Sequence, residues 1–145
     1  MERDEALIKR HEGYRDRVYK DTVGILTVGW GHALQAGSPI PAAASEALFA
    51  DDYRKAKLAL AGLVADGLVP ADLCEARRAV LVNMAFNLGV AGLRKFGRTL
   101  EAIRRGDFVA ASEAMKDSLW ARQVKSRADD LSAMMETGEF PSYLK

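Results

Sequence analysis

Hydrophobic and polar positions divide the chain into a short strand-rich segment near the N-terminus and a long helical remainder. Residues 2–11 mix apolar and charged side chains, which predicts a short amphipathic helix, and Gly13 predicts its end. Residues 17–21 and 25–30 are rich in β-branched and aromatic side chains. Because the turn between them contains a glycine, we expect these two segments to pair as a β-hairpin.

The polar residues 33–41, which include glycine and proline, predict the boundary between the hairpin and the helical part. Apolar residues recur near a 3.6-residue period over residues 41–64, which predicts a helix of roughly 35 Å, long enough to join two lobes. Residues 76–88 carry no charge after Arg78. A helix that is apolar on every side belongs in a core, so we expect this helix at the centre, ending at Gly89.

Further helical patterns follow toward the C-terminus, and we expect helices at residues 93–104, 107–119, 124–135 and 136–144. Together these elements predict a mainly helical α+β fold in a single domain. The domain is expected to have a small β lobe at 13–40, a joining helix at 41–65, and a helical lobe made of 1–12 and 66–145.

The composition is that of an ordinary globular protein, with 49% hydrophobic and 28% charged residues among 145. The net charge of +1 and the absence of any Lys/Arg run longer than two residues argue against a nucleic-acid partner. No segment reaches the roughly 18 consecutive apolar residues typical of a membrane span, so stable membrane insertion is not expected. The charged N-terminus shows no secretory signal pattern.

The single cysteine and the two histidines bear on disulfide formation and on metal binding. Cys74 is alone, so an intramolecular disulfide cannot form, and its apolar helical surroundings predict a buried thiol. His32 has no second histidine or cysteine at ligand spacing. We therefore expect no metal site.

Glu12, Asp21 and Thr27 form the pattern Glu-x8-Asp-x5-Thr, which continues as Gly-x-Gly-His at 29–32. Two carboxylates at the edges of two elements are what hydrolysis of a glycosidic bond requires. Glu12 lies at the end of the first helix, where the partial negative charge favours a protonated acid. Asp21, on a solvated hairpin, can stay charged and orient water. Taken singly, Glu12 could be a surface glutamate and Thr27 an ordinary strand residue, but the full pattern favours catalysis.

With its surrounding letters Tyr-Lys-Asp-Thr at 19–22 and Thr-Val-Gly-Trp-Gly-His at 27–32, this pattern resembles the phage-type lysozymes, the endolysins of glycoside hydrolase family 24. The similarity is not confined to the N-terminus. Further segments are similar to the bridging helix, the core helix and the C-terminal helices of the family, at residues 46–49, 77–79, 83–89 and 120–127.

The resemblance implies a lysozyme-like fold with the active site in a cleft between the two lobes. It implies hydrolysis of the β-1,4 bond between N-acetylmuramic acid and N-acetylglucosamine in bacterial peptidoglycan, with inversion. Glu12 would be the general acid, and Asp21 with Thr27 would hold the attacking water. The expected partner is peptidoglycan, and the protein is expected to be a monomer that needs no cofactor.

The resemblance also implies supporting roles for Arg127 and His32. It places Arg127 beside Glu12 as an ion-pair partner, although a solvated helix charge is the alternative reading. Such a partner would favour the charged form of Glu12 and so oppose the effect of the helix end. It pairs His32 with Asp52 on the bridging helix, which is a structural role.

Three residues of the helical part are implied to contact or line the sugar site. Phe86 and Asn87 would reach the cleft, and Thr99 would line it. Core packing is an equally good reading for Phe86. For Asn87 we favour a place in the cleft, because an asparagine in an apolar helix is costly without a hydrogen bond. Trp120 is expected in the core.

Two other functions fit parts of the sequence. A lytic transglycosylase manages with one catalytic acid, so the presence of Asp21 and Thr27 argues against it. A non-catalytic peptidoglycan-binding module would not need the intact carboxylate pair. For a lysozyme made in the host cytoplasm and acting in the periplasm, we expect delivery through a holin-type pore or by a leader absent from this sequence.

Overall fold

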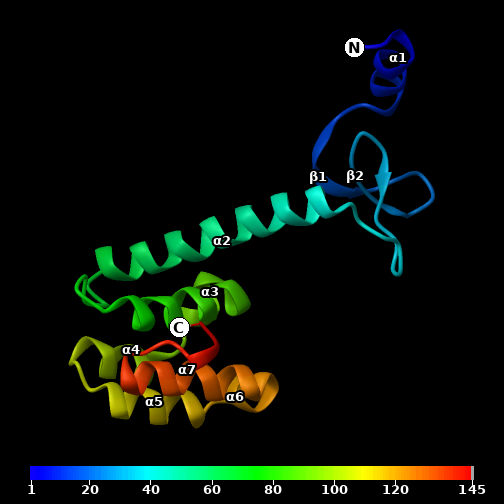
Figure 1. The fold of residues 1–145 in the computed structure, drawn as a ribbon. Coiled ribbons are helices and arrows are strands. Elements are labelled where there is room, and N and C mark those ends of the chain that lie inside the picture. Colours follow the sequence, from blue (N-terminus) through cyan, green and yellow to red (C-terminus); the bar gives the residue numbers. More distant parts are fainter. Residues whose placement is uncertain (145) are drawn as a thin grey trace. The chain divides into compact units, whose positions relative to one another are not determined.

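A computed structural model describes residues 1–144 as a mainly helical protein with one small antiparallel sheet (Figure 1). The chain divides into two compact units, Met1–Ser45 and Glu46–Lys145. We call the first the N-terminal unit and the second the helical unit. The predicted fold class, α+β and mainly α, is confirmed. The grouping of residues 1–12 with the helical lobe stays a prediction.

The N-terminal unit holds one helix and a three-stranded sheet in the order β1-β2-β3. Its elements are α1 (Arg3–Glu12), β1 (Arg15–Lys20), β2 (Leu26–Gly29) and β3 (His32–Ala33). The predicted helix and hairpin are confirmed, but the third strand was not predicted. It forms because the chain reverses through Gly29 and Gly31, whose φ angles of 67° and 71° favour glycine.

Thr27 occupies the middle strand of this sheet. It pairs with Tyr19 on β1 and with Ala33 on β3. Among residues 1–45, all of which are described, it is the only buried residue, with 4% of its surface exposed. The register of β1 is irregular between Arg15 and Tyr19, so a bulge bends the outer strand. The sheet therefore encloses Thr27 more completely than any other side chain of the unit.

The helical unit is built by helices that pack around α5 and α7. Its elements are α2 (Ala42–Ala65, which begins in the N-terminal unit), α3 (Glu75–Arg94), α4 (Gly97–Arg104), α5 (Phe108–Lys116), α6 (Leu119–Val124), α7 (Ser126–Thr137) and a 3-10 turn (Ser142–Leu144). The pair α5 and α7 lie side by side, α4 packs on α5, and α3 and α6 pack on α7 (Figure 1).

Every buried hydrophobic residue of the described chain lies in the helical unit, between Ala56 and Met135. The predicted core helix is confirmed, because α3 buries six residues: Ala76, Val80, Leu81, Met84, Ala85 and Leu93. Trp120, at 4% exposed, is a core residue as expected. The periodic apolar pattern of α2 contributes Ala56, Ala59, Leu60 and Leu63.

The predicted boundaries after the core helix need correction in two places. Gly89 has φ 73° and ψ 168° and interrupts α3 where its end was predicted, but helical residues resume and continue to Arg94. The helix predicted over 93–104 is therefore divided. Phe96 has non-helical backbone angles, and α4 begins only at Gly97.

Side-chain caps explain the other divisions. The Asp107 side chain accepts a hydrogen bond from Ala110 N and starts α5. The Ser118 hydroxyl accepts one from Ala121 N and starts α6, a short helix that was not predicted. No single helix covers residues 136–144, because α7 continues to Thr137 and only the 3-10 turn Ser142–Leu144 follows. Gly138, at φ 74°, ends α7 instead.

The prediction of a buried thiol is wrong, because Cys74 is exposed. Cys74 is the residue that precedes α3, and its Sγ lies 3.7 Å from the carbonyl oxygen of Gly138. Because Cys74 precedes the helix, its side chain lies outside the apolar stripe that the periodicity predicted.

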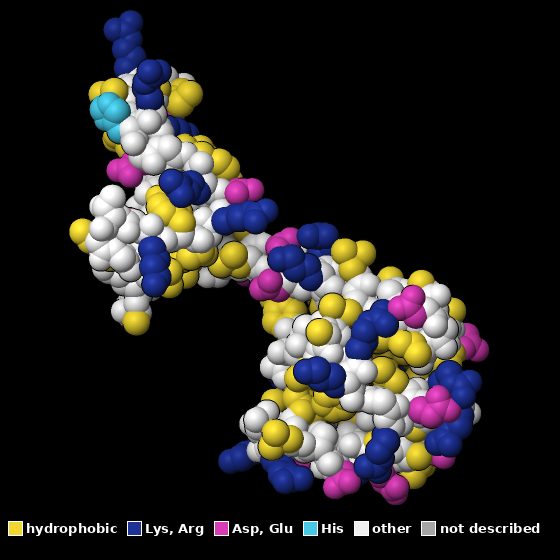
Figure 2. All heavy atoms as spheres, turned by 180° about the vertical axis from the view of Figure 1, so that it is seen from behind, with side chains coloured by type: hydrophobic (Ala, Val, Ile, Leu, Met, Phe, Trp, Pro, Cys, Tyr) yellow, Lys and Arg dark blue, Asp and Glu magenta, His cyan; other side chains and the backbone are white. Residues whose placement is uncertain are grey.

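The surface of the helical unit carries both signs of charge. On the visible face, Lys and Arg side chains intermingle with Asp and Glu side chains (Figure 2). This mixture agrees with the net charge of +1. Among residues 1–144, none of the helices combines the length and apolar composition that crossing a membrane requires.

Candidate functional site

The first carboxylate of the pattern, Glu12, is the last residue of α1 and is exposed. The helix stops here because Gly13, at φ 69°, turns the chain away while its N–H still donates to Lys9 O at 3.0 Å. The Glu12 carboxylate lies against the backbone of Gly31, in the turn between β2 and β3. A Cβ atom built on Gly31 would lie 2.8 Å from Glu12 Cδ and would contact its Oε2.

The second carboxylate, Asp21, is fixed by the loop that joins β1 to β2. Its Oδ1 accepts hydrogen bonds from Val23 N at 2.9 Å and from Ile25 N at 2.8 Å. Its own backbone N–H donates to Ile25 O at 2.9 Å. The two bonds to Oδ1 set the direction of the carboxylate, and the backbone bond closes the loop. The other oxygen, Oδ2, makes no hydrogen bond with the residues that the structure describes.

Thr27 is tied to the same loop. Its hydroxyl donates to Ile25 O at 2.9 Å, so this carbonyl oxygen accepts from both Thr27 and the Asp21 backbone. A hydroxyl has a single hydrogen to donate. Because that hydrogen is already used, the Thr27 oxygen is oriented as an acceptor. The loop thus presents two acceptors, a carboxylate oxygen and a hydroxyl oxygen, connected through one carbonyl group.

His32 lies on β3 opposite Val28 and is exposed. Asp52, its expected partner, and Arg127, the expected partner of Glu12, both belong to the helical unit. Both pairings stay predictions. Within residues 1–144 no group of three or more His, Cys, Asp or Glu side chains is arranged to hold a metal ion.

In the helical unit, Phe86 and Arg127 line one groove of about 910 Å³. Phe86 is 42% exposed, and its ring centroid lies 5.6 Å from that of Phe49, which in turn stacks on Tyr53 at 5.9 Å. Lys57 lies over the Tyr53 ring at 4.5 Å. The structure therefore brings two of the sequence-predicted residues to one aromatic groove and leaves Phe86 outside the core.

Asn87 has a structural partner that sequence reasoning missed. Its Oδ1 accepts a hydrogen bond of 2.9 Å from Nε1 of the buried Trp120. The signal was present in the sequence, because a buried indole N–H and an asparagine in an apolar helix both need partners. Thr99 lies on α4 and is only 2% exposed. That burial lends no support to a contact between Thr99 and sugar.

Comparison with known proteins matches residues 9–134 to the phage lysozyme family. The pre-baseplate central spike protein Gp5 of Enterobacteria phage T4 is 32% identical over 94% of this chain, and the match spans 28% of that protein. The probable T4-type lysozyme 1 of Dictyostelium discoideum is 26% identical over 94% of this chain and 95% of its own length. The SAR-endolysin of Bacteriophage PS119 is 29% identical over 72% of this chain and 61% of its own length.

Proposed function

Because this chain belongs to the phage lysozyme family, we propose that it is a lysozyme that cleaves bacterial peptidoglycan. The bond cleaved is the β-1,4 bond between N-acetylmuramic acid and N-acetylglucosamine. The names of two relatives, a T4-type lysozyme and an endolysin, support this proposal. The observation that carries it is the loop in which Asp21 and Thr27 share the Ile25 carbonyl, in the same unit as Glu12.

Glu12 acts as the general acid in this mechanism. Its carboxyl group donates a proton to the glycosidic oxygen as the bond to the anomeric carbon breaks, so the leaving sugar departs as an alcohol. The proton lost by Glu12 is the one that the leaving group gains.

Asp21 and Thr27 hold the attacking water. Asp21 Oδ2 accepts one hydrogen of the water and takes that proton during attack, while Thr27 Oγ1 accepts the other hydrogen. The oxygen then has a lone pair directed to the anomeric carbon. Attack from the face opposite the leaving group gives inversion. The contact of Thr27 with Ile25 O supports this role, because it orients the hydroxyl as an acceptor.

The remaining residues bind or support the site. Phe86 contacts sugar at the groove of the helical unit, as its exposure and its place beside Phe49 support. The Asn87 amide nitrogen can still donate to sugar while Oδ1 holds Trp120. The family resemblance implies that Arg127 supports Glu12, and this role is part of the proposal. The enzyme acts on the cell wall in the periplasm, and the outcome is lysis of the host cell.

The test is digestion of purified peptidoglycan, followed by mass spectrometry of the fragments. A lysozyme leaves reducing muramic acid ends, whereas anhydro-muramic ends would identify a lytic transglycosylase instead. Replacing Glu12→Gln should lower turnover by about 10²- to 10⁴-fold, the usual contribution of a general acid. Glu2→Gln makes the same charge change at the start of α1 and should leave turnover unchanged. Cell-wall clearing that persists in Glu12→Gln would overturn the assignment.

Inversion has its own test. NMR of the first product formed from the β-linked substrate should show the α-anomer before mutarotation. A β-anomer as first product would exclude Asp21 as a water-holding base and would point to a covalent intermediate.

A further inference from the structure

Gly31 is placed where a side chain and the Glu12 carboxylate cannot both fit. A Cβ atom at this position would lie 2.8 Å from Glu12 Cδ and 3.3 Å from its Cγ, besides the closer contact with Oε2. Cβ atoms essentially never approach other heavy atoms to less than about 3 Å, because the repulsion is too strong. The carboxylate is the end of a flexible side chain. A methyl group on Gly31 would therefore push the Glu12 carboxylate away and leave most of the turn in place.

Gly29 supplies a matched comparison within the same turn. Its φ of 67° is almost that of Gly31, at 71°. A Cβ atom on Gly29 would meet nothing within 4 Å. Both positions thus need glycine for the backbone, but only Gly31 needs it for space. This space beside Gly31 is what the Glu12 carboxylate occupies.

The turn that carries Gly31 is held to α1 by the neighbouring Trp30. The ring centroid of Trp30 lies 4.7 Å from that of Tyr14, and Lys9 Nζ lies 4.8 Å from the Trp30 ring. Lys9 comes from the last turn of α1, and Tyr14 follows Glu12 by two residues. Residues on both sides of Glu12 therefore contact Trp30, so the distance between the turn and the end of α1 is fixed.

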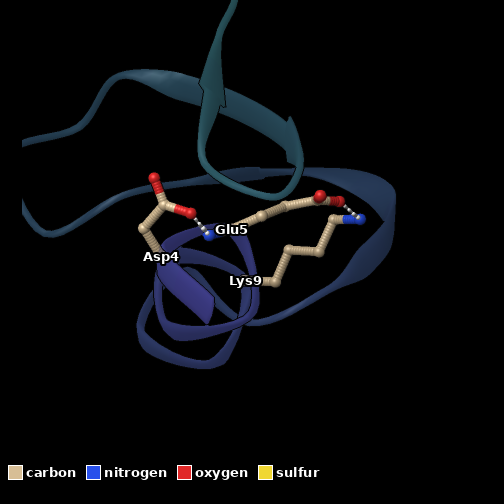
Figure 3. A network of polar contacts seen from close by, with 3 residues as sticks. All are labelled: Asp4, Glu5 and Lys9. Atoms are coloured by element: carbon tan, nitrogen blue, oxygen red, sulfur yellow. Dashed lines mark hydrogen bonds and ion pairs between the residues drawn. The ribbon is translucent and has the colours of Figure 1, made fainter. Parts of the chain in front are cut away.

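Lys9 is itself oriented along α1. Its Nζ lies 2.7 Å from Glu5 Oε1, and Asp4 Oδ1 accepts the Glu5 N–H at 2.9 Å (Figure 3). The Lys9 ammonium, through its hydrogen bond and its charge, holds the pKa of the Glu5 carboxyl below its usual value. Because the carboxyl pKa is lowered, the Glu5–Lys9 pair contributes stability at pH values above the ordinary pKa of glutamate, and this contribution is lost as the pH falls through the lowered pKa. At neutral pH, Glu5 thus keeps Lys9 beside Trp30.

We propose that Gly31 is a positioning residue for Glu12, because its missing side chain leaves the space that the carboxylate occupies. The contacts of Trp30 with Lys9 and Tyr14 keep this space in register with the end of α1. The consequence for catalysis rests on the proposed function, in which Glu12 is the acid. The steric relation between Gly31 and Glu12 does not depend on it.

The experiment compares Gly31→Ala with Gly29→Ala in the full chain. Both variants force alanine into the left-handed region, so both should raise the unfolding equilibrium constant about 5- to 30-fold. Turnover on peptidoglycan should fall about 10²-fold in Gly31→Ala, as expected for a catalytic group displaced by about 1 Å. Gly29→Ala should keep turnover within about threefold of the parent, because nothing lies near its new methyl group.

Two further readouts separate positioning from general damage. In Gly31→Ala, kcat should fall while KM stays unchanged, because the acid is displaced and the residues proposed to bind sugar are untouched. The ¹³C resonance of the Glu12 carboxyl should shift in Gly31→Ala and stay in place in Gly29→Ala. Equal turnover in the two alanine variants, or an unmoved Glu12 resonance, would overturn the proposal.

Two outcomes keep this inference distinct from the proposed function. If Glu12→Gln stays active while the Glu12 resonance still responds to Gly31→Ala, the catalytic assignment fails and the positioning relation stands. If Gly31→Ala fails to fold, a second replacement, Glu12→Ala, should restore folding by removing the displaced side chain. Unfolding that persists in the double variant would show that crowding of Glu12 is not the cause.

Discussion

At the scale of single residues, a backbone carbonyl group fixes the orientation of the Thr27 hydroxyl before substrate binds. The middle strand buries the side chain, and Ile25 O takes its hydrogen. A hydroxyl that was free to rotate could donate to the water instead of accepting from it. The hydrogen bond removes that freedom, so orientation is built into the loop.

Replacing Thr27→Val keeps the shape of the side chain and removes the oxygen. We expect turnover to fall about 10²-fold, because the water loses one of its two acceptors and its orientation. Thr27→Ser keeps the hydroxyl and should retain most activity. Peptidoglycan turnover measures the effect, and urea unfolding should show a loss of only about 1 kcal/mol, since Ile25 O still accepts from Asp21. Full activity in Thr27→Val would remove Thr27 from the mechanism.

Two buried serines differ in a way that predicts opposite effects on stability. Ser112 on α5 is completely buried, and its hydroxyl has no hydrogen-bond partner within residues 1–144. Ser132 on α7 is equally buried but donates to Ala128 O at 2.6 Å.

Ser112→Ala removes an unsatisfied polar group and should raise the free energy of unfolding by about 1 kcal/mol. Ser132→Ala removes a hydrogen bond and should lower it by about the same amount. Urea denaturation of both variants at one pH measures the difference. A loss of stability in Ser112→Ala would mean that its hydroxyl has a partner in solution.

At the scale of elements, one arginine connects three helices of the helical unit. Arg77 on α3 donates from Nε to Met135 O at 2.9 Å and from an Nη atom to Glu136 O at 3.0 Å, near the end of α7. Its guanidinium also lies 3.5 Å from the centroid of Phe108, the first residue of α5. A cation at a helix C-terminus is favourable, because the last carbonyl groups carry a partial negative charge.

Arg77→Leu should therefore lower the free energy of unfolding by about 2 kcal/mol, the usual range for hydrogen bonds from a charged donor. Arg78→Leu is the matched control. Arg78 is exposed and makes no hydrogen bond or ion pair with the described residues, so its replacement should change stability by less than about 0.5 kcal/mol. Thermal or urea unfolding tests both. Equal effects of the two replacements would contradict the role given to Arg77.

At the scale of the whole molecule, the two units differ in how much apolar surface each one buries. The hydrophobic core belongs to the helical unit, whereas the N-terminal unit buries only Thr27. Local opening costs least where few apolar contacts are lost. The residues proposed for chemistry, Glu12, Asp21 and Thr27, thus belong to the unit with less internal stabilisation.

We expect amide hydrogen exchange to follow this division. Backbone amides of β1 and β2 should exchange at lower opening free energy than those of the core helix α3, which requires opening of the packed helices. Exchange measured by NMR at several urea concentrations gives both values. Equal protection of the sheet and of α3 would show that the two units open together.

Local patterns were sufficient to predict the elements whose apolar spacing is regular. The period of residues 41–64 predicted α2 within one residue at each end, and the uncharged run before Gly89 predicted the core helix. Such patterns are visible in a sequence because a helix buries residues at fixed intervals. The spacing of Glu12, Asp21 and Thr27 likewise identified the candidate site, and the family match agrees with the resemblance on which it rested.

Only the tertiary structure decided the features that depend on residues far apart in the chain. The third strand exists because Gly29 and Gly31 reverse the chain, and Cys74 is exposed because it precedes the helix whose pattern it seemed to share. Trp120 meets Asn87 across 33 positions of sequence. Glu12 reaches Gly31 only once α1 and the sheet have folded against each other. A sequence specifies which side chains can do chemistry, but contacts between elements decide where each one points.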